Sequence, residues 1–183
     1  ASYSAVTFGA PTTPPTPAPS SNPCPTSWNC QDIGNPALVG NQSLNGNTWT
    51  LQGAGSDIWF YSDQFHYVWQ PLPADGGVKA QVLTQTYTNP WVKTGVMLRQ
   101  STDPASPYYA VLATPSNGIV VQYRAVQGGN TVQVATTAGT VPTYLWAVRS
   151  GTTFSAYTST DGVSWTLVPG SSISLNITGT LLA

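Results

Sequence analysis

Short runs in which apolar and polar residues alternate follow one another from Trp28 to the C-terminus. A period of two places successive side chains on opposite faces of a β-strand, whereas an amphipathic helix repeats every 3.6 residues. We find no helical repeat of useful length. We therefore predict strands at residues 43–44, 48–52, 58–61, 65–71, 77–86, 93–100, 108–114, 118–126, 131–135, 144–150, 153–159, 164–167 and 172–175.

Turn signals separate these runs. Residues with the conformational freedom that tight hairpin turns need occur in four motifs, Asn45-Gly46, Asn117-Gly118, Gly128-Gly129-Asn130 and Asp161-Gly162. Many short strands joined by such turns are typical of an all-β antiparallel sandwich of two sheets. We expect this fold for residues 26–183.

The segment 55–70, GSDIWFYSDQFHYVWQ, combines large aromatic residues with the only histidine of the chain. Alternation places Phe65, Tyr67 and Trp69 on one face of a strand and His66 on the other. A single strand histidine without a nucleophile to activate is best explained as a hydrogen-bonded structural residue. We interpret this segment as a structural strand pair and not as an active site.

The N-terminal residues differ from the rest of the chain. Residues 11–25, PTTPPTPAPSSNPCP, are rich in proline, which fits neither a helix interior nor the middle of a sheet, so we expect an extended linker. Residues 1–10 have strand propensity but no hairpin partner nearby in sequence. The residues of this candidate donor strand are Tyr3, Ser4, Ala5, Val6, Thr7 and Phe8.

Charged side chains are scarce, at 6 % of 183 residues with a net charge of −1, against the usual share of about 25 %. The basic residues stand singly, so nucleic acid is not an expected partner. No apolar run approaches the about 20 residues that a membrane span requires, and we expect no membrane insertion. Weak repulsion between copies of such a chain favours self-association.

Two features favour an exported protein. Cys24 and Cys30 can close a short loop, and a disulfide between them implies an oxidising compartment. Asn41 and Asn176 each begin an acceptor triplet for N-glycosylation. We expect an extracellular or cell-surface protein whose secretion signal has been removed.

A resemblance to a known family rests on several motifs in the same order: CQDIGNPALVGN, GAGSDIWF, DQFHYVWQPL, NPWVKTGVMLRQS, YLWAVRSG and FSAYTSTDGVSWTLV. From about Trp28 to the C-terminus the chain resembles bacterial secreted modules of the concanavalin A-like jelly-roll superfamily, of the regulation-of-enolase-like or domain-of-unknown-function type. The resemblance implies a two-sheet antiparallel jelly roll without an established catalytic activity. Carbohydrate binding is the usual suggestion for such modules.

The resemblance also implies two further strands beyond ISLNITGTLLA, and residues 4–8 are similar to the last of them. A sandwich without an edge strand exposes backbone groups and part of its core. The missing strand can come from the chain's own N-terminal arm, from the arm of a neighbouring copy or from residues outside this sequence. We favour the neighbouring copy, because a proline-rich arm of about 15 residues spans up to about 45 Å. Such head-to-tail strand exchange builds a filament or surface array from a non-catalytic structural subunit.

The alternative function is a carbohydrate-binding module of a larger secreted protein. Exposed aromatic rings can stack on sugars. Trp91, Tyr108 and Tyr109 lie beside turn signals, where we expect exposed rings, while most other Trp and Tyr residues are expected in the core.

We do not expect an enzyme. Glycoside hydrolysis uses two carboxylates, but the chain has no glutamate, and Asp57 and Asp63 are its only close pair of aspartates. Together with Ser56 they offer oxygen ligands for calcium, although their spacing matches no recognised calcium loop. No other cofactor is expected.

Overall fold

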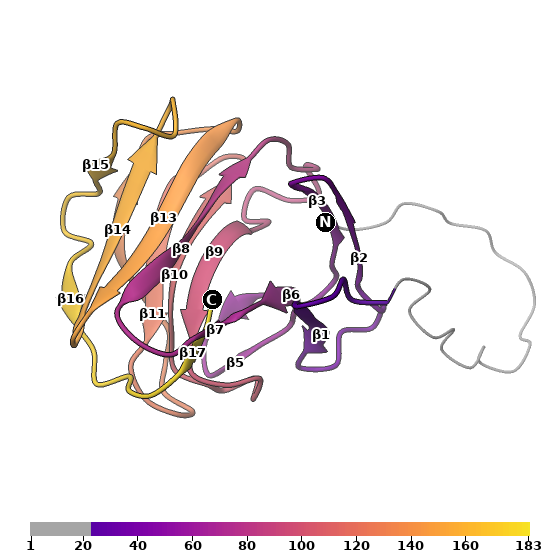
Figure 1. Ribbon diagram of the computed structural model, residues 1–183, viewed down its shortest axis with the longest axis horizontal. Helices are drawn as coiled ribbons and strands as arrows, with labels where there is room; N and C mark the ends of the chain where they lie inside the picture. Colours follow the sequence, from indigo (N-terminus) through magenta and orange to yellow (C-terminus); the bar gives the residue numbers. More distant parts are fainter. Residues whose placement is uncertain (1–22) are drawn as a thin grey trace, which may run out of the picture.

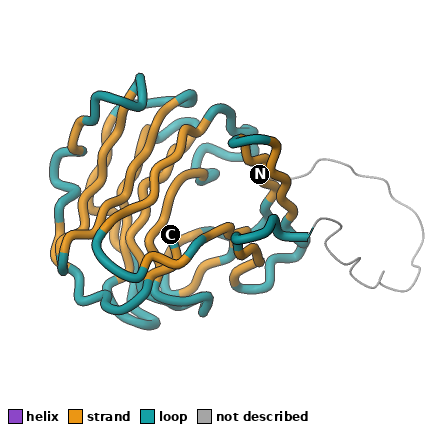
Figure 2. The backbone as a smooth tube through the Cα atoms, in the orientation of Figure 1, coloured by secondary structure: helices purple, strands orange, loops and turns teal. Residues whose placement is uncertain are grey.

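The computed structural model describes residues 23–183, and every regular element in this range is a β-strand (Figure 1). Figure 2 shows the same part of the chain as strands joined by loops and turns. The predicted donor strand, Tyr3 to Phe8, and most of the predicted linker at residues 11–25 lie outside the described residues. Within residues 23–183 there is no helix long and apolar enough to span a bilayer.

The larger of the two main sheets has six antiparallel strands in the order β12-β11-β10-β9-β17-β7. Its strands are β7 (Pro71–Leu72), β9 (Thr94–Arg99), β10 (Tyr108–Thr114), β11 (Gly118–Arg124), β12 (Val132–Thr137) and β17 (Leu181–Leu182).

The second main sheet has five antiparallel strands, in the order β15-β14-β13-β8, with β16 also paired to β14. Its strands are β8 (Gly76–Val82), β13 (Thr143–Ser150), β14 (Thr153–Ser159), β15 (Thr166–Leu167) and β16 (Ile173–Ser174). The all-β class and the two main antiparallel sheets are confirmed, and the jelly-roll strand order stays a prediction.

Three short antiparallel pairs come from the first part of the described chain. They are β1 (Asn29–Ile33) with β6 (Phe65–Trp69), β2 (Asn41–Asn45) with β3 (Thr48–Gln52), and β4 (Ile58–Trp59) with β5 (Ser62–Asp63). Figure 1 shows β1, β2, β3 and β6 on the side of the six-stranded sheet that lies away from β13 and β14. These pairs therefore form a partial third layer.

The main core lies between the two large sheets. Leu98 and Tyr109 of the six-stranded sheet pack with Leu145 and Phe154 of the five-stranded sheet, and all four are fully buried. Burial of side chains of this size contributes about 1.5–3 kcal/mol each to folding.

A second apolar cluster covers the other face of the six-stranded sheet. Ile33 of β1 and Tyr67 and Trp69 of β6 pack there against Met97 and Tyr108. All seven residues of β10 are consequently buried, which explains why this strand is a continuous apolar run, YYAVLAT, and does not alternate. Because Tyr67 and Trp69 share this cluster with Phe65, the predicted face of β6 is confirmed.

Two local predictions are also confirmed. Asn117-Gly118 joins β10 to β11, and Gly118 has a φ of 73°. A Cβ at this position would lie 2.5 Å from the Thr137 carbonyl oxygen, so only glycine fits without strain. Cys24 and Cys30 form the predicted disulfide, which ties the start of the described chain to β1.

Candidate functional site

The strand β9 is fully paired on one side only. It pairs with β10 from Thr94 to Arg99, but on its other side the single pair among residues 23–183 joins Arg99 to Leu182 of β17. The Met97 carbonyl points to this second side, where it lies 3.1 Å from the Tyr67 hydroxyl. By alternation, the backbone groups of Gly95 also point there, and no described strand pairs with them.

Tyr67 closes the end of this gap. Its hydroxyl lies 2.8 Å from the Leu182 carbonyl as well as close to that of Met97, so one hydroxyl proton is shared between carbonyls of two strands, β9 and β17. Burial raises the pKa of Tyr67 above its ordinary value, and the nearby Arg99 charge offsets only part of this effect. The hydroxyl therefore stays protonated, and remains a donor, across the physiological pH range.

The strand β8 ends the five-stranded sheet and pairs only with β13 within the described chain. Residues directly opposite one another in a sheet share a face. Leu145 is opposite Ala80 and Ala147 is opposite Val78. Leu145 and Ala147 are fully buried in the main core, yet Ala80 is exposed and Val78 is half-buried. The main core is therefore open to solvent along β8.

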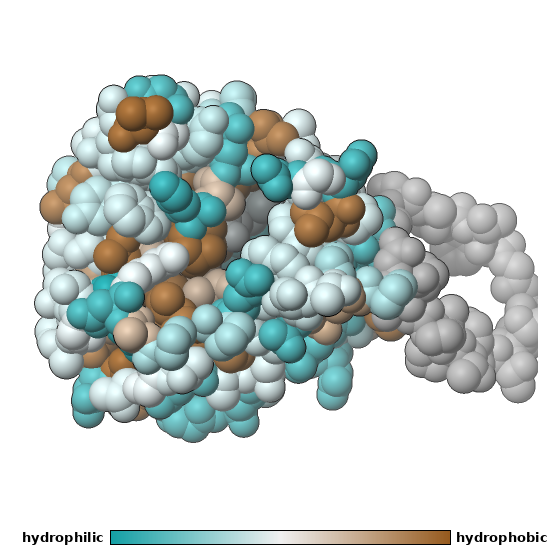
Figure 3. Space-filling view, viewed as in Figure 1, coloured by the Kyte–Doolittle hydropathy of each residue, from teal (hydrophilic) through white to brown (hydrophobic). Residues whose placement is uncertain are grey.

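These two unpaired strand sides lie next to each other (Figure 1), and we call them together the open edge. Figure 3 shows apolar residues gathered over this part of the surface, and Leu83, just after β8, is 49 % exposed. Natural edge strands are commonly protected by proline, charge or bulges. From Thr94 to Leu98, β9 has neither proline nor a charged residue.

A buried ion cluster lies on the far face of the six-stranded sheet. The Asp63 Oδ2 accepts from Arg99 Nη1 at 2.7 Å and from Arg124 Nη1 at 2.7 Å, while Oδ1 accepts from Arg124 Nη2 at 2.7 Å. All three side chains are fully buried. The Tyr108 ring lies 5.1 Å from the Arg124 guanidinium, within the range of a cation–π contact. The cluster fastens the β4–β5 hairpin to the sheet.

Sequence reasoning missed this cluster. The signal was present, because Arg99 and Arg124 end largely apolar strands, VMLR and VVQYR. A charged residue within a strand that is otherwise buried is rarely buried itself unless it is paired. The partner Asp63 lies 36 residues from Arg99 and 61 from Arg124, so no local pattern identifies it.

The structure does not assemble the proposed calcium ligands. Both oxygens of Asp63 are bound by arginine, and Asp57 Oδ1 accepts from Lys93 Nζ at 2.7 Å. No group of three or more His, Cys, Asp or Glu side chains suited to a metal is found within residues 23–183. The enclosed Asp63 also cannot reach a glycosidic bond as one of two flanking carboxylates.

His66 is hydrogen-bonded on both sides, as the structural interpretation predicts. Its Nδ1 lies 2.8 Å from Asp32 Oδ1, and its Nε2 lies 2.8 Å from Gln42 Oε1. The Asp32 carboxylate also accepts from the Gly40 amide at 2.9 Å. These contacts join β1, β6 and the β2–β3 hairpin.

The predicted glycan contacts have different outcomes. Trp91 is 47 % exposed, as expected. Tyr108 and Tyr109 are fully buried, so the expectation of exposed rings there is wrong. The reason is that β10 is covered on both faces; Tyr109, for example, donates to the Ser171 carbonyl at 2.8 Å inside the main core.

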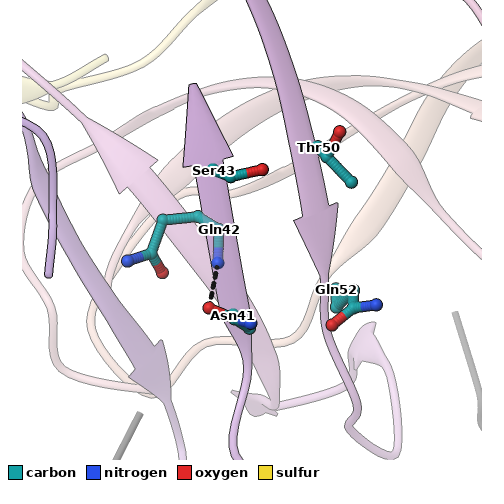
Figure 4. A pocket seen from close by; sticks show the side chains of 5 residues that line it. All are labelled: Asn41, Gln42, Ser43, Thr50 and Gln52. Carbon is teal, nitrogen blue, oxygen red and sulfur yellow. Dashed lines mark hydrogen bonds between the residues drawn. The ribbon is translucent and has the colours of Figure 1, made fainter. Parts of the chain in front are cut away.

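The two glycosylation triplets lie at the surface. Asn176 is exposed, whereas Asn41 is half-buried and its side-chain oxygen accepts from the Gln42 amide at 2.9 Å. Asn41 also lines a small depression of about 110 Å³ on the β2–β3 hairpin together with Gln42, Ser43, Thr50 and Gln52 (Figure 4). Occupancy of both triplets stays a prediction.

Comparison of the chain with models of protein families, with curated proteins and with solved structures finds no match. The resemblance to concanavalin A-like modules therefore stays at the level of sequence motifs.

Proposed function

We propose that the protein is a secreted structural subunit that polymerises head to tail, with residues 2–8 of one copy added as a strand at the open edge of the next. The observation that carries this proposal is Ala80, which belongs to the core face of β8 and yet is exposed. An added strand would pair the free backbone groups of β9 and cover the apolar surface beside them.

The side-chain pattern of the donor segment fits the two apolar clusters that meet at β9. Val96 contributes to the main core, and Met97 contributes to the second cluster on the other face. A strand beside β9 would likewise turn one face to each cluster. Val6 and Phe8 share one face of the donor segment, and small residues alternate with them. Neither face would bring a charge into the interface.

The gains from apolar burial and backbone pairing oppose the cost of association. Burial of Val6 and Phe8 contributes about 1.5–3 kcal/mol each, and each new backbone hydrogen bond contributes about 0.5–1.5 kcal/mol net. Association itself costs about 4–15 kcal/mol. Filament growth is a bimolecular step, so its extent depends on protein concentration, and assembly at micromolar concentration requires the gains to exceed the association cost by about 8 kcal/mol.

Two further features support a location outside the cytosol and contact between copies. The Cys24–Cys30 disulfide suits an oxidising compartment, such as the extracellular space or cell surface. The net charge of −1 leaves little repulsion between subunits. We propose other copies of the chain as the principal partners and assign no catalytic role.

The experiment compares Ala80→Asp with Gln81→Asp in the full chain. Both positions are exposed on β8, but residue 80 faces the core and residue 81 faces outward. We expect Ala80→Asp to abolish filaments, because a carboxylate would be buried under the added strand. Gln81→Asp should assemble like the unmodified chain. Negative-stain electron microscopy and light scattering over a concentration series measure the outcome.

A second experiment identifies the donor strand. Deletion of residues 1–10 should leave folded monomers, and a synthetic peptide of residues 2–8 should bind these monomers in fluorescence anisotropy. The same peptide with Phe8→Asp should not bind. Monomers of the full chain at all concentrations, or filaments that persist after the deletion, would refute the proposal.

A further inference from the structure

A second surface feature lies apart from the core face of β8. Asp57, Trp59, Trp91, Lys93 and Gln133 line a pocket with a volume of about 280 Å³. They come from three separate parts of the chain: the β4 strand and the residue before it, the loop between β8 and β9, and β12. The tertiary fold alone brings them together.

The aromatic wall of the pocket is exposed, and the backbone of the loop that carries Trp91 is held in place. Trp91 is 47 % exposed, although its loop is tied down at two points. Its amide donates to Asn89 Oδ1 at 2.6 Å, and Asn117 Nδ2 donates to the Pro90 carbonyl at 2.8 Å. Trp59 is half-buried and its ring lies 5.1 Å from the Lys93 ammonium group. Because the loop backbone is already held, a ligand that stacks on the exposed Trp91 ring has little backbone to order.

The polar wall offers hydrogen-bond acceptors without net charge. Asp57 is held through Oδ1 by Lys93 Nζ at 2.7 Å and by the Ile58 amide at 2.7 Å. Its Oδ2 makes no hydrogen bond to the described residues, and the Asp57 side chain is 41 % exposed. Gln133 Nε2 donates to Thr136 Oγ1 at 2.7 Å, which leaves the amide oxygen free to accept. The single ammonium group in the pocket is already paired.

We propose that this pocket binds one sugar ring of a neutral polysaccharide. An indole face packs against the C–H face of a pyranose, while carboxylate and amide oxygens accept from its hydroxyl groups. The volume lies just below the range of about 300–1,000 Å³ typical of sites for drug-sized ligands, which suits one ring and not a longer buried chain. The pairing of Lys93 with Asp57 disfavours phosphates and acidic glycans, because the one ammonium group of the pocket is already paired and the Asp57 carboxylate repels anions.

This inference is independent of the polymer proposal. A filament that also binds a neutral glycan would attach to a polysaccharide matrix, whereas a monomer with this pocket would act as a simple binding module. The two proposals are tested by different variants, so either can fail alone.

The experiment uses the full chain and measures binding by isothermal titration calorimetry. The probes are hexasaccharides of β-1,4-glucan, β-1,3-glucan, β-1,4-xylan and β-1,4-mannan, with oligogalacturonate as an acidic comparison. We expect at least one neutral hexasaccharide to bind and Trp91→Ala to weaken that binding about tenfold or more. The matched control is Tyr87→Ala, which removes an exposed ring, 62 % exposed, from the same loop but outside the pocket; it should bind normally.

Three results would overturn the proposal. They are absence of binding to every neutral probe, equal loss of binding in Trp91→Ala and Tyr87→Ala, and binding of oligogalacturonate alone. Circular dichroism melting of both variants checks that they fold, and light scattering should show that Trp91→Ala leaves assembly unchanged.

Discussion

The replacement Asp63→Asn tests the buried ion cluster, because it changes a charge while nearly preserving shape. In the folded protein three hydrogen bonds of 2.7 Å join Asp63 to the guanidinium groups of Arg99 and Arg124. An asparagine would place an NH₂ group against one guanidinium and leave two buried cations without a counter-charge.

The expected loss follows from this geometry. Removal of one partner from a buried ion pair costs about 3–5 kcal/mol, because the remaining charge stays desolvated. For a protein of this size, about 1 kcal/mol corresponds to about 2–4 °C in melting temperature. We therefore expect Asp63→Asn to lower the melting temperature by about 6–20 °C and to consume a large part of an unfolding free energy of about 5–15 kcal/mol.

The assay is urea unfolding and thermal melting followed by circular dichroism. Asp75→Asn is the matched control, since Asp75 also faces an arginine, Arg149, but at 3.9 Å and with its side chain 62 % exposed. An exposed pair contributes about 0–1 kcal/mol. Equal effects of the two replacements, or a loss below about 1 kcal/mol for Asp63→Asn, would show that the buried cluster does not stabilise the fold as we reason.

The remaining predictions concern single contacts. Gly118→Ala should destabilise the protein more than Gly46→Ala in urea unfolding. Both glycines have positive φ, which strains alanine by about 1–2 kcal/mol, but only at Gly118 would the Cβ also meet a backbone oxygen at 2.5 Å. Equal losses of unfolding free energy would contradict this reasoning. Tyr67→Phe should lower the unfolding free energy by about 1–3 kcal/mol because two strand carbonyls lose their donor, whereas Tyr61→Phe, at a ring 61 % exposed, should have almost no effect. Asp161→Ala should lower the melting temperature at pH 6 and have a smaller effect at pH 2.5, because hydrogen bonds from backbone amides hold the pKa of the Asp161 carboxyl below its ordinary value. The stability that this gives is complete above the unfolded pKa of about 3.9, and it decreases progressively as pH falls from there towards the folded pKa. An unchanged difference between the two pH values would contradict this reasoning.

Strand positions could be predicted where local pattern and turn chemistry agree. The ranges 48–52, 108–114 and 153–159 coincide with the observed β3, β10 and β14. The strand β1 was not predicted, because Asn29–Ile33 reads NCQDI and is largely polar. It becomes a strand by pairing with β6, so the residues that determine its conformation lie in another segment of the chain.

Exposure was harder to predict than strand identity. Tyr108 and Tyr109 follow a proline turn, which locally favours an exposed position. Both are buried because β10 has a sheet on one side and the β1–β6 layer on the other. A run of apolar residues cannot reveal how many layers will cover it.

The candidate sites also combine features that local sequence indicates with features that depend on the tertiary structure. Trp91 was identified from its turn, but Asp57, Trp59, Lys93 and Gln133 were not identified as its neighbours. The open edge was expected only in general terms, as a missing strand. Its location beside β8 and β9 depends on which strands happen to pair across the two main sheets.

Local sequence was sufficient to predict the all-β class, the disulfide and the faces of the aromatic strand β6, because these depend on residues within a few positions of one another. The packing of the sheets produced the burial of Tyr108, the ion cluster around Asp63, the pocket beside Trp91 and the exposure of Ala80. Each of these depends on segments that are distant in sequence and meet only when sheets pack, so the free energy that fixes them comes from non-local contacts that no local pattern records.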